Sequence, residues 1–185
     1  NKYTSRYSIR MVRSKSETSV IYLMGMPGCG KTTLGKELAK KLNYKFVDLD
    51  DYIEMEKGIS IPTIFKIHGE DFFRKTEQKA VLNSSKWNNT VVACGGGAPC
   101  FFDNMQVMNQ AGKTIFIDVS LTELMKRLYG KGQNNRPILA NKTEKELKIE
   151  LGNKIRDRKL FFNQAHKVLT SDKLKTEDIL FSLNS

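Results

Sequence analysis

Residues 25–33 (GMPGCGKTT) combine three glycines, a lysine and two threonines directly after an apolar run. The Gly-x4-Gly-Lys-Thr spacing is a full match to the Walker A pattern of a phosphate-holding loop. Its glycines let backbone N–H groups turn toward phosphate oxygens, and the following helix adds its positive dipole end. Lys31 supplies a charge for the β- and γ-phosphates, and the Thr32 hydroxyl is a ligand for Mg²⁺. The residues predicted to hold a nucleoside triphosphate are Gly28, Cys29, Gly30, Lys31, Thr32 and Thr33.

Two carboxylates, Asp48 and Asp50, follow the next predicted strand. Ligands of an open α/β sheet gather at the carboxyl ends of its strands, so both groups are expected near the nucleotide. Alternation along an extended strand would put them on one side. One would then serve Mg²⁺, and the other would accept a proton from an attacking hydroxyl. The alternative is that Asp50 or Asp51 only caps the following helix.

Two further stretches carry groups suited to an acidic ligand. Glu77 follows Arg74 by one helical turn and can hold the guanidinium rigid, although an exposed pair of this kind contributes little energy. Gly95, Gly96 and Gly97 follow a predicted strand, where they would let backbone N–H groups approach a ligand closely. A plain tight turn is the alternative interpretation of these glycines.

The elements that must position these residues alternate along the chain, which indicates an α/β fold with helices on both faces of a parallel sheet. We expect strands at 20–24, 45–48, 90–94, 113–119 and 166–170. We expect helices near 31–42, 61–68, 70–84, 102–111, 121–130, 143–162 and 176–183. Two helix starts are predicted by capping-box spacing, Ser120 with Glu123 and Thr143 with Glu146.

Length and charge favour one domain with an anionic ligand. The 185 residues suffice for one core, which we assign to 20–185. The net charge of +11 is concentrated in residues 1–19 and 126–167. We interpret 1–19 as a flexible basic leader or cloning remnant, with an organellar transit peptide as the alternative. Three cysteines without a zinc or disulfide pattern favour a reducing, cytoplasmic setting, and no apolar run is long enough to span a membrane.

The order of these motifs resembles the shikimate kinase family over roughly residues 19 to 172. The resemblance rests on Walker A, Asp-x-Asp, Phe-Arg-x-x-Glu, Gly-Gly-Gly, Arg-Pro-x-Leu and a late arginine. It implies a five-stranded parallel sheet in the P-loop fold of the nucleoside monophosphate kinase type, with a substrate-binding segment at about 50–84 and a lid at about 129–142. It also implies transfer of the ATP γ-phosphate, with Mg²⁺, to the 3-hydroxyl of shikimate, a step toward chorismate and the aromatic amino acids.

Carried over by position, the resemblance implies a role for each motif. Asp50 would bind substrate hydroxyls and act as the base, and Asp48 would join Thr32 near the metal. Arg74 would grip the shikimate carboxylate. The glycines at its side, contributing backbone contacts to the substrate, would be Gly95, Gly96 and Gly97. The catalytic set implied in this way is Lys31, Asp50 and Arg136.

The later arginines match the family pattern less uniformly. Arg136, in Arg-Pro-x-Leu, matches the lid arginine that closes over the phosphates, and Arg127 resembles the residue lying against adenine. Arg158 falls where the family has a second carboxylate-binding arginine, but the usual proline and tyrosine are missing and Arg156 competes for the role. The lid between Arg127 and Arg136 is also longer than usual, which leaves the adenine contact open.

Two alternative interpretations of the function remain open. Another small P-loop kinase, acting on gluconate or a nucleoside monophosphate, would share the loop and the fold. An inactive ATP-binding module or a nucleic-acid binder would use the basic surface instead, but residues 126–167 contain few aromatic side chains for stacking on bases. We expect shikimate as the small-molecule partner, no nucleic acid, no membrane and a monomeric protein.

Overall fold

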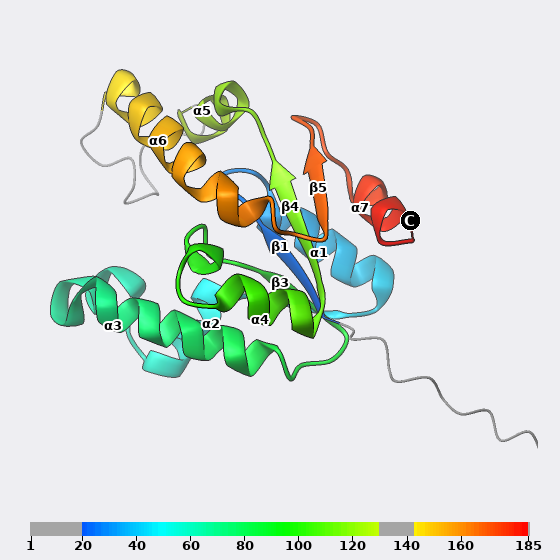
Figure 1. The fold of residues 1–185 in the computed structure, drawn as a ribbon, viewed down its shortest axis with the longest axis horizontal. Coiled ribbons are helices and arrows are strands. Elements are labelled where there is room, and N and C mark those ends of the chain that lie inside the picture. Colours follow the sequence, from blue (N-terminus) through cyan, green and yellow to red (C-terminus); the bar gives the residue numbers. More distant parts are fainter. Residues whose placement is uncertain (1–19, 130–142, 185) are drawn as a thin grey trace, which may run out of the picture.

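A computed structural model describes residues 20–129 and 143–184 (Figure 1). Its five strands form one sheet in the order β2-β3-β1-β4-β5, and every neighbouring pair is parallel. The strands are β1 (Val20–Met24), β2 (Lys45–Asp48), β3 (Thr90–Ala93), β4 (Lys113–Asp118) and β5 (Lys167–Thr170). The chain therefore has the five-stranded parallel α/β sheet that the alternating pattern predicts.

Helices cover both faces of this sheet. Figure 1 shows α1 and α7 on one face, with α4 and α6 on the other. The helices are α1 (Lys31–Leu42), α2 (Leu49–Lys57), α3 (Ile61–Ser84), α4 (Asn104–Ala111), α5 (Leu121–Tyr129), α6 (Glu144–Phe162) and α7 (Thr176–Asn184), with a 3-10 turn η1 (Ala98–Cys100). No helix in the described part of the chain is long and apolar enough to cross a membrane.

The central strand β1 leads directly into the phosphate loop. It lies between β3 and β4, where the strand order reverses. All five of its residues are buried, so both of its faces are packed. The Tyr22 hydroxyl is hydrogen bonded to Ser84 at 3.1 Å, which satisfies its polar end inside the core. A crevice at such a reversal point is where open α/β sheets bind ligands.

Strand alternation is the wrong reason for expecting Asp48 and Asp50 together. β2 ends at Asp48, and α2 begins at Leu49. The Asp48 carboxylate is the N-cap of α2 and accepts a hydrogen bond from the Asp50 backbone N–H at 3.1 Å. The expectation that Asp50 or Asp51 caps this helix is therefore also wrong, since both lie in its first turn.

The two predicted capping boxes have different outcomes. At Thr143 both halves of the box are present, and α6 begins at the next residue. At Ser120 the hydroxyl accepts from the Glu123 N–H at 3.2 Å, but the Ser120 N–H donates to Asp172 at 2.8 Å. A carboxylate from the segment after β5 thus replaces the expected one and ties α5 to that segment.

Candidate active site

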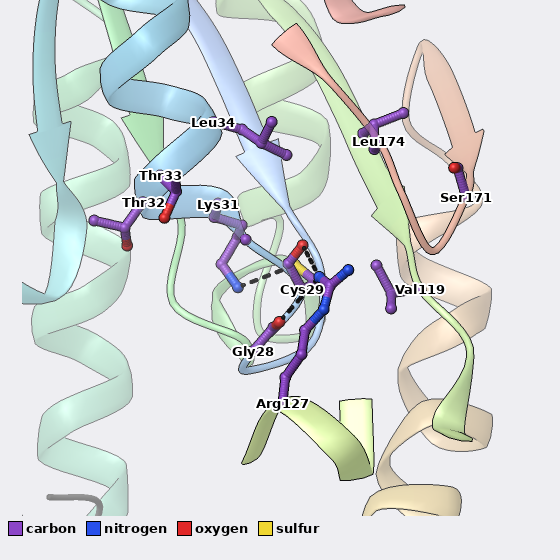
Figure 2. A pocket seen from close by; sticks show the side chains of 11 residues that line it. Gly28, Cys29, Lys31, Thr32, Thr33, Leu34, Val119, Arg127, Ser171 and Leu174 are labelled. Atoms are coloured by element: carbon purple, nitrogen blue, oxygen red, sulfur yellow. Dashed lines mark hydrogen bonds between the residues drawn. The ribbon is translucent and has the colours of Figure 1, made fainter. Parts of the chain in front are cut away.

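The phosphate loop joins the end of β1 to the start of α1. Gly28 and Gly30 have φ angles of +85° and +105°, which favour glycine, and Gly30 is the N-cap of α1. The Lys31 ammonium lies inside the loop and donates to the backbone oxygens of Gly25 and Met26 at 2.9 and 3.1 Å. It also lies 3.7 Å from the Cys29 sulfur, as Figure 2 shows. The lysine is therefore held at the loop's inner face.

A cleft of about 380 Å³ opens beside this loop (Figure 2). Arg127 reaches into it from α5, with its Nε donating to Glu123 at 2.8 Å and its Nη1 to the Cys29 oxygen at 3.2 Å. The cleft is lined by Gly28, Cys29, Gly30, Lys31, Thr32, Thr33, Leu34, Val119, Arg127, Ser171 and Leu174. All the residues predicted to hold the nucleotide, except Arg136, therefore line one cleft.

Sequence reasoning missed the far wall of this cleft. Val119 directly follows β4, and Ser171 and Leu174 follow β5. The rule that ligands bind at strand carboxyl ends applies to these two strands as it does to β1. It could have found them once the strand order was known.

The Thr32 hydroxyl donates to Asp48 Oδ2 at 3.3 Å. A hydroxyl and a carboxylate at the mouth of the phosphate loop are hard oxygen donors, the ligands that Mg²⁺ prefers. The same Asp48 carboxylate uses its other oxygen to cap α2. The side chains present thus fit a magnesium ion.

Asp50 lies beside Gly95 and within the electrostatic influence of Lys31 in the phosphate loop. Burial raises the pKa of its carboxyl to about 6, reinforced by the negative charge of Asp48 and opposed by Lys31. A carboxylate with a pKa near neutrality is suited to accept a proton during catalysis. Its position is fixed by the first turn of α2.

The glycine turn, residues 95–97 after β3, lies against four charged groups, those of Asp50, Glu77, Arg74 and Arg158. A Cβ at Gly95 would lie 2.6 Å from an Asp50 carboxylate oxygen, and one at Gly96 would lie 3.0 Å from Arg158 Nη1. A Cβ at Gly97 would lie 2.8 Å from Arg74 Nη1. Glycine is therefore needed here for the close approach of side chains. The turn thus lies beside a cluster of two carboxylates and two guanidinium groups.

Arg74 is held on several sides. Its Nη1 donates to Glu77 at 2.8 Å, while Nε and Nη2 donate to Glu70 at 3.1 and 3.0 Å. The guanidinium carbon lies 3.9 Å from the ring centre of Phe101. Glu77 is only 1% exposed, so the predicted pair is buried rather than a surface salt bridge. Burial also raises the pKa of Glu77, although Arg74 opposes this shift.

Arg158 and Arg156 lie in different surroundings. Arg158 is half-buried beside Gly96, and burial lowers the pKa of its guanidinium, opposed by Cys100. Arg156 is exposed and lies 3.5 Å from its neighbour Asp157. Only Arg158 of the two contacts the glycine turn. Arg136 and nearly all of the expected lid lie outside the described residues.

Glu70 and Phe101 both contact Arg74, and the sequence did not reveal either contact. Glu70 is four residues before Arg74, so helical spacing was an available signal. The contact of Phe101 with Arg74 joins the segment after η1 to α3, and no local spacing could have predicted it.

The parallel sheet and the loop at its reversal point define the class of the chain, a P-loop kinase. The shikimate kinase family model matches residues 27–183. A shikimate kinase from Azobacteroides pseudotrichonymphae is 40% identical over 164 residues, which cover 88% of this chain and 96% of that protein. The chain belongs to the shikimate kinase family.

Solved structures agree with this assignment. Shikimate kinase from Bacteroides thetaiotaomicron superposes with a TM-score of 0.83 at 38% identity, covering 89% of this chain and 96% of that one. Shikimate kinase from Acinetobacter baumannii, solved in complex with shikimate, gives 0.78 at 29% identity and covers 90% of each chain. The chain is thus an ATP-dependent kinase with an alcohol acceptor.

Proposed function

We propose that the chain transfers the γ-phosphate of ATP to the 3-hydroxyl of shikimate, giving shikimate 3-phosphate and ADP. ATP would bind in the cleft beside the phosphate loop, and shikimate would bind at the glycine turn. The observation that carries this proposal is the glycine turn, which contacts Asp50, Arg74 and Arg158 together. Its support from related proteins is family membership and the shikimate complex of the Acinetobacter enzyme.

Recognition of the acid rests on the two arginines. Guanidinium groups form forked, charge-assisted hydrogen bonds with a planar carboxylate, so they orient it as well as attract it. Arg74 and Arg158 approach adjacent positions of the glycine turn. A carboxylate held there would direct the ring hydroxyls toward Asp50.

Proton transfer is assigned to Asp50. Its raised pKa makes it a better base than an exposed aspartate, and its contact with Gly95 puts it on the acceptor side of the phosphate loop. In this mechanism Asp50 accepts the proton of the 3-hydroxyl as the oxygen attacks the γ-phosphorus. Phosphoryl transfer otherwise depends mostly on positioning and charge.

The nucleotide side is assigned to the cleft. Loop N–H groups and Lys31 would hold the phosphates, and Arg127 would lie against the adenine. Thr32 and Asp48 would hold Mg²⁺, which when bound neutralises charge on the β- and γ-phosphates. Arg136 remains a predicted lid arginine, and its removal is expected to lower kcat by roughly 10³-fold.

The setting of the enzyme is also part of the proposal. We expect the enzyme to be a monomer. Three free cysteines are compatible with the expected cytoplasmic location.

ATP consumption with shikimate, gluconate or AMP as acceptor tests the function. The proposal predicts rapid consumption with shikimate and little above the ATP-only background with the other two. A preference for gluconate or AMP would identify another small-molecule kinase. Hydrolysis of ATP that no acceptor changes would contradict the proposed transfer.

A further inference from the structure

The guanidinium of Arg74 already binds a carboxylate of the protein, that of Glu70, along one of its edges. Glu70 Oε1 accepts from both Nε and Nη2 of Arg74, and Glu77 Oε2 accepts from Nη1. The end-on edge between Nη1 and Nη2 faces Gly97, where a Cβ would lie 2.8 and 3.1 Å from the two nitrogens. Glu70 therefore occupies the edge of Arg74 formed by Nε and Nη2.

The charges around the glycine turn give the same indication. Arg74 and Arg158 face three carboxylates, those of Asp50, Glu70 and Glu77. A bound acid would add a fourth carboxylate to this partly buried cluster, which contains only two guanidinium groups. Like charges in such a site are costly unless one of them leaves.

Glu70 and Glu77 differ in their freedom to leave. Glu77 is 1% exposed, so its release would strand a buried charge. Glu70 is 56% exposed, so water can replace Arg74 as its partner at little cost. Glu70 also directly follows Gly69, where the helical φ and ψ angles of α3 are interrupted at 79° and 176°.

We infer that Glu70 is an internal stand-in for the substrate carboxylate, and that a bound acid takes its place on the Nε and Nη2 edge of Arg74. This inference rests on the proposed function, since it takes Arg74 as the carboxylate anchor. It makes acid recognition an exchange of carboxylates. A neutral analogue cannot gain the bonds that displace Glu70, so Glu70 contributes to specificity for acids.

Calorimetric titration with shikimate and with its methyl ester tests the exchange. Glu70→Gln removes the competing charge, so the Kd for shikimate should fall by roughly 3-fold, within the range of a partly exposed ion pair. The Kd for the neutral ester should stay unchanged. Asp71→Asn is the matched control, because it removes the same charge from an exposed neighbour and should not change the Kd for shikimate.

Three results would overturn the inference: a higher Kd for shikimate in the Glu70→Gln protein, which a clamp that only positions Arg74 would give; an unchanged Kd; or an equal gain from Asp71→Asn. Thermal unfolding of both variants verifies that they are folded. Failure of the proposed function is distinguishable, because the unaltered protein would then neither bind nor phosphorylate shikimate.

Discussion

Burial separates the carboxylates near the phosphate loop into different roles. Asp48 caps α2 and meets Thr32, while Asp50 is buried against Gly95 on the acceptor side. Asp51 follows in the same helical turn but is exposed. Three neighbouring acids thus lie at the phosphate loop, at the glycine turn and in solvent.

The raised pKa of Asp50, about 6, predicts an acidic limb in the rate profile. Because the base must be unprotonated, kcat/KM for shikimate should fall as the pH drops through about 6. Asp50→Asn should lose on the order of 10²-fold in turnover and keep its affinity for ATP. Steady-state rates between pH 5 and 8 check both points, and turnover by Asp50→Asn near that of the unaltered enzyme would disprove the assignment.

The same group affects stability with the opposite sign. The folded protein binds this proton more tightly than the unfolded chain, whose Asp50 has the ordinary pKa of 3.8. The contribution of Asp50 to the free energy of unfolding is therefore fully present below that value and is lost as the pH rises through about 6.

The pair Arg156 and Arg158 offers a matched test of acid recognition. Arg158→Gln should raise the KM for shikimate by roughly 10-fold or more, since it removes a charge-assisted bond, with the KM for ATP unchanged. Arg156→Gln should alter neither value, because Arg156 is exposed and paired with Asp157. Equal effects of the two substitutions would show that only the overall charge matters.

At the scale of elements, the boundaries of the helices depend on side-chain caps, which strand periodicity does not reveal. The sequence located all five strands to within one residue, because each is a short apolar run with clear flanks. It gave no bounds for α2, whose start depends on the side chain of Asp48 accepting a backbone bond. Position along a strand is predictable from alternation, whereas the point at which a strand turns into a helix depends on such single bonds.

Gly69 shows the same lesson within one helix. The separate expected helices 61–68 and 70–84 form one element, α3, with a break at Gly69. The φ and ψ angles there, 79° and 176°, lie in a region open to glycine alone. The break separates the first part of α3 from the segment that begins at Glu70 and carries Arg74.

Gly69→Ala should therefore lower the free energy of unfolding by roughly 1 to 3 kcal/mol. No atom lies within 4 Å of the added Cβ, so the loss would come from the backbone alone. Gly58→Ala is the control, because Gly58 also has open space but adopts ordinary left-handed angles that alanine tolerates better. Urea unfolding measures both, and an equal or smaller loss at Gly69 would contradict the account.

At the scale of the whole molecule, strand ends far apart in sequence meet at one edge of the sheet. Residues at the ends of β1, β4 and β5 line the cleft. The ends of β2 and β3 lead to Asp50 and to the glycine turn. The motif residues at the ends of β1, β2 and β3 were predictable from the sequence, whereas the cleft residues that follow β4 and β5 were not. Their mutual contacts were not predictable either, since they depend on the strand order.

Arg127 connects parts of the cleft, because it contacts the phosphate loop, Glu123 and the Asp172 backbone. Arg127→Ala should raise the KM for ATP by roughly 3- to 10-fold, the range of a desolvated cation–π contact, with little change for shikimate. Lys126→Ala, on the exposed side of α5, should change neither. A selective rise in the KM for shikimate would show that Arg127 serves the other pocket.

In the proposed complex, the acid lies at the glycine turn with its alcohol directed at the terminal phosphate. A crystal structure with shikimate and a non-hydrolysable ATP analogue tests it most directly. The account predicts the carboxylate on Arg74 and Arg158, with the 3-hydroxyl hydrogen bonded to Asp50 and about 3 to 3.5 Å from the γ-phosphorus. An acid bound away from the glycine turn, or turned with its carboxylate toward Asp50, would contradict the account.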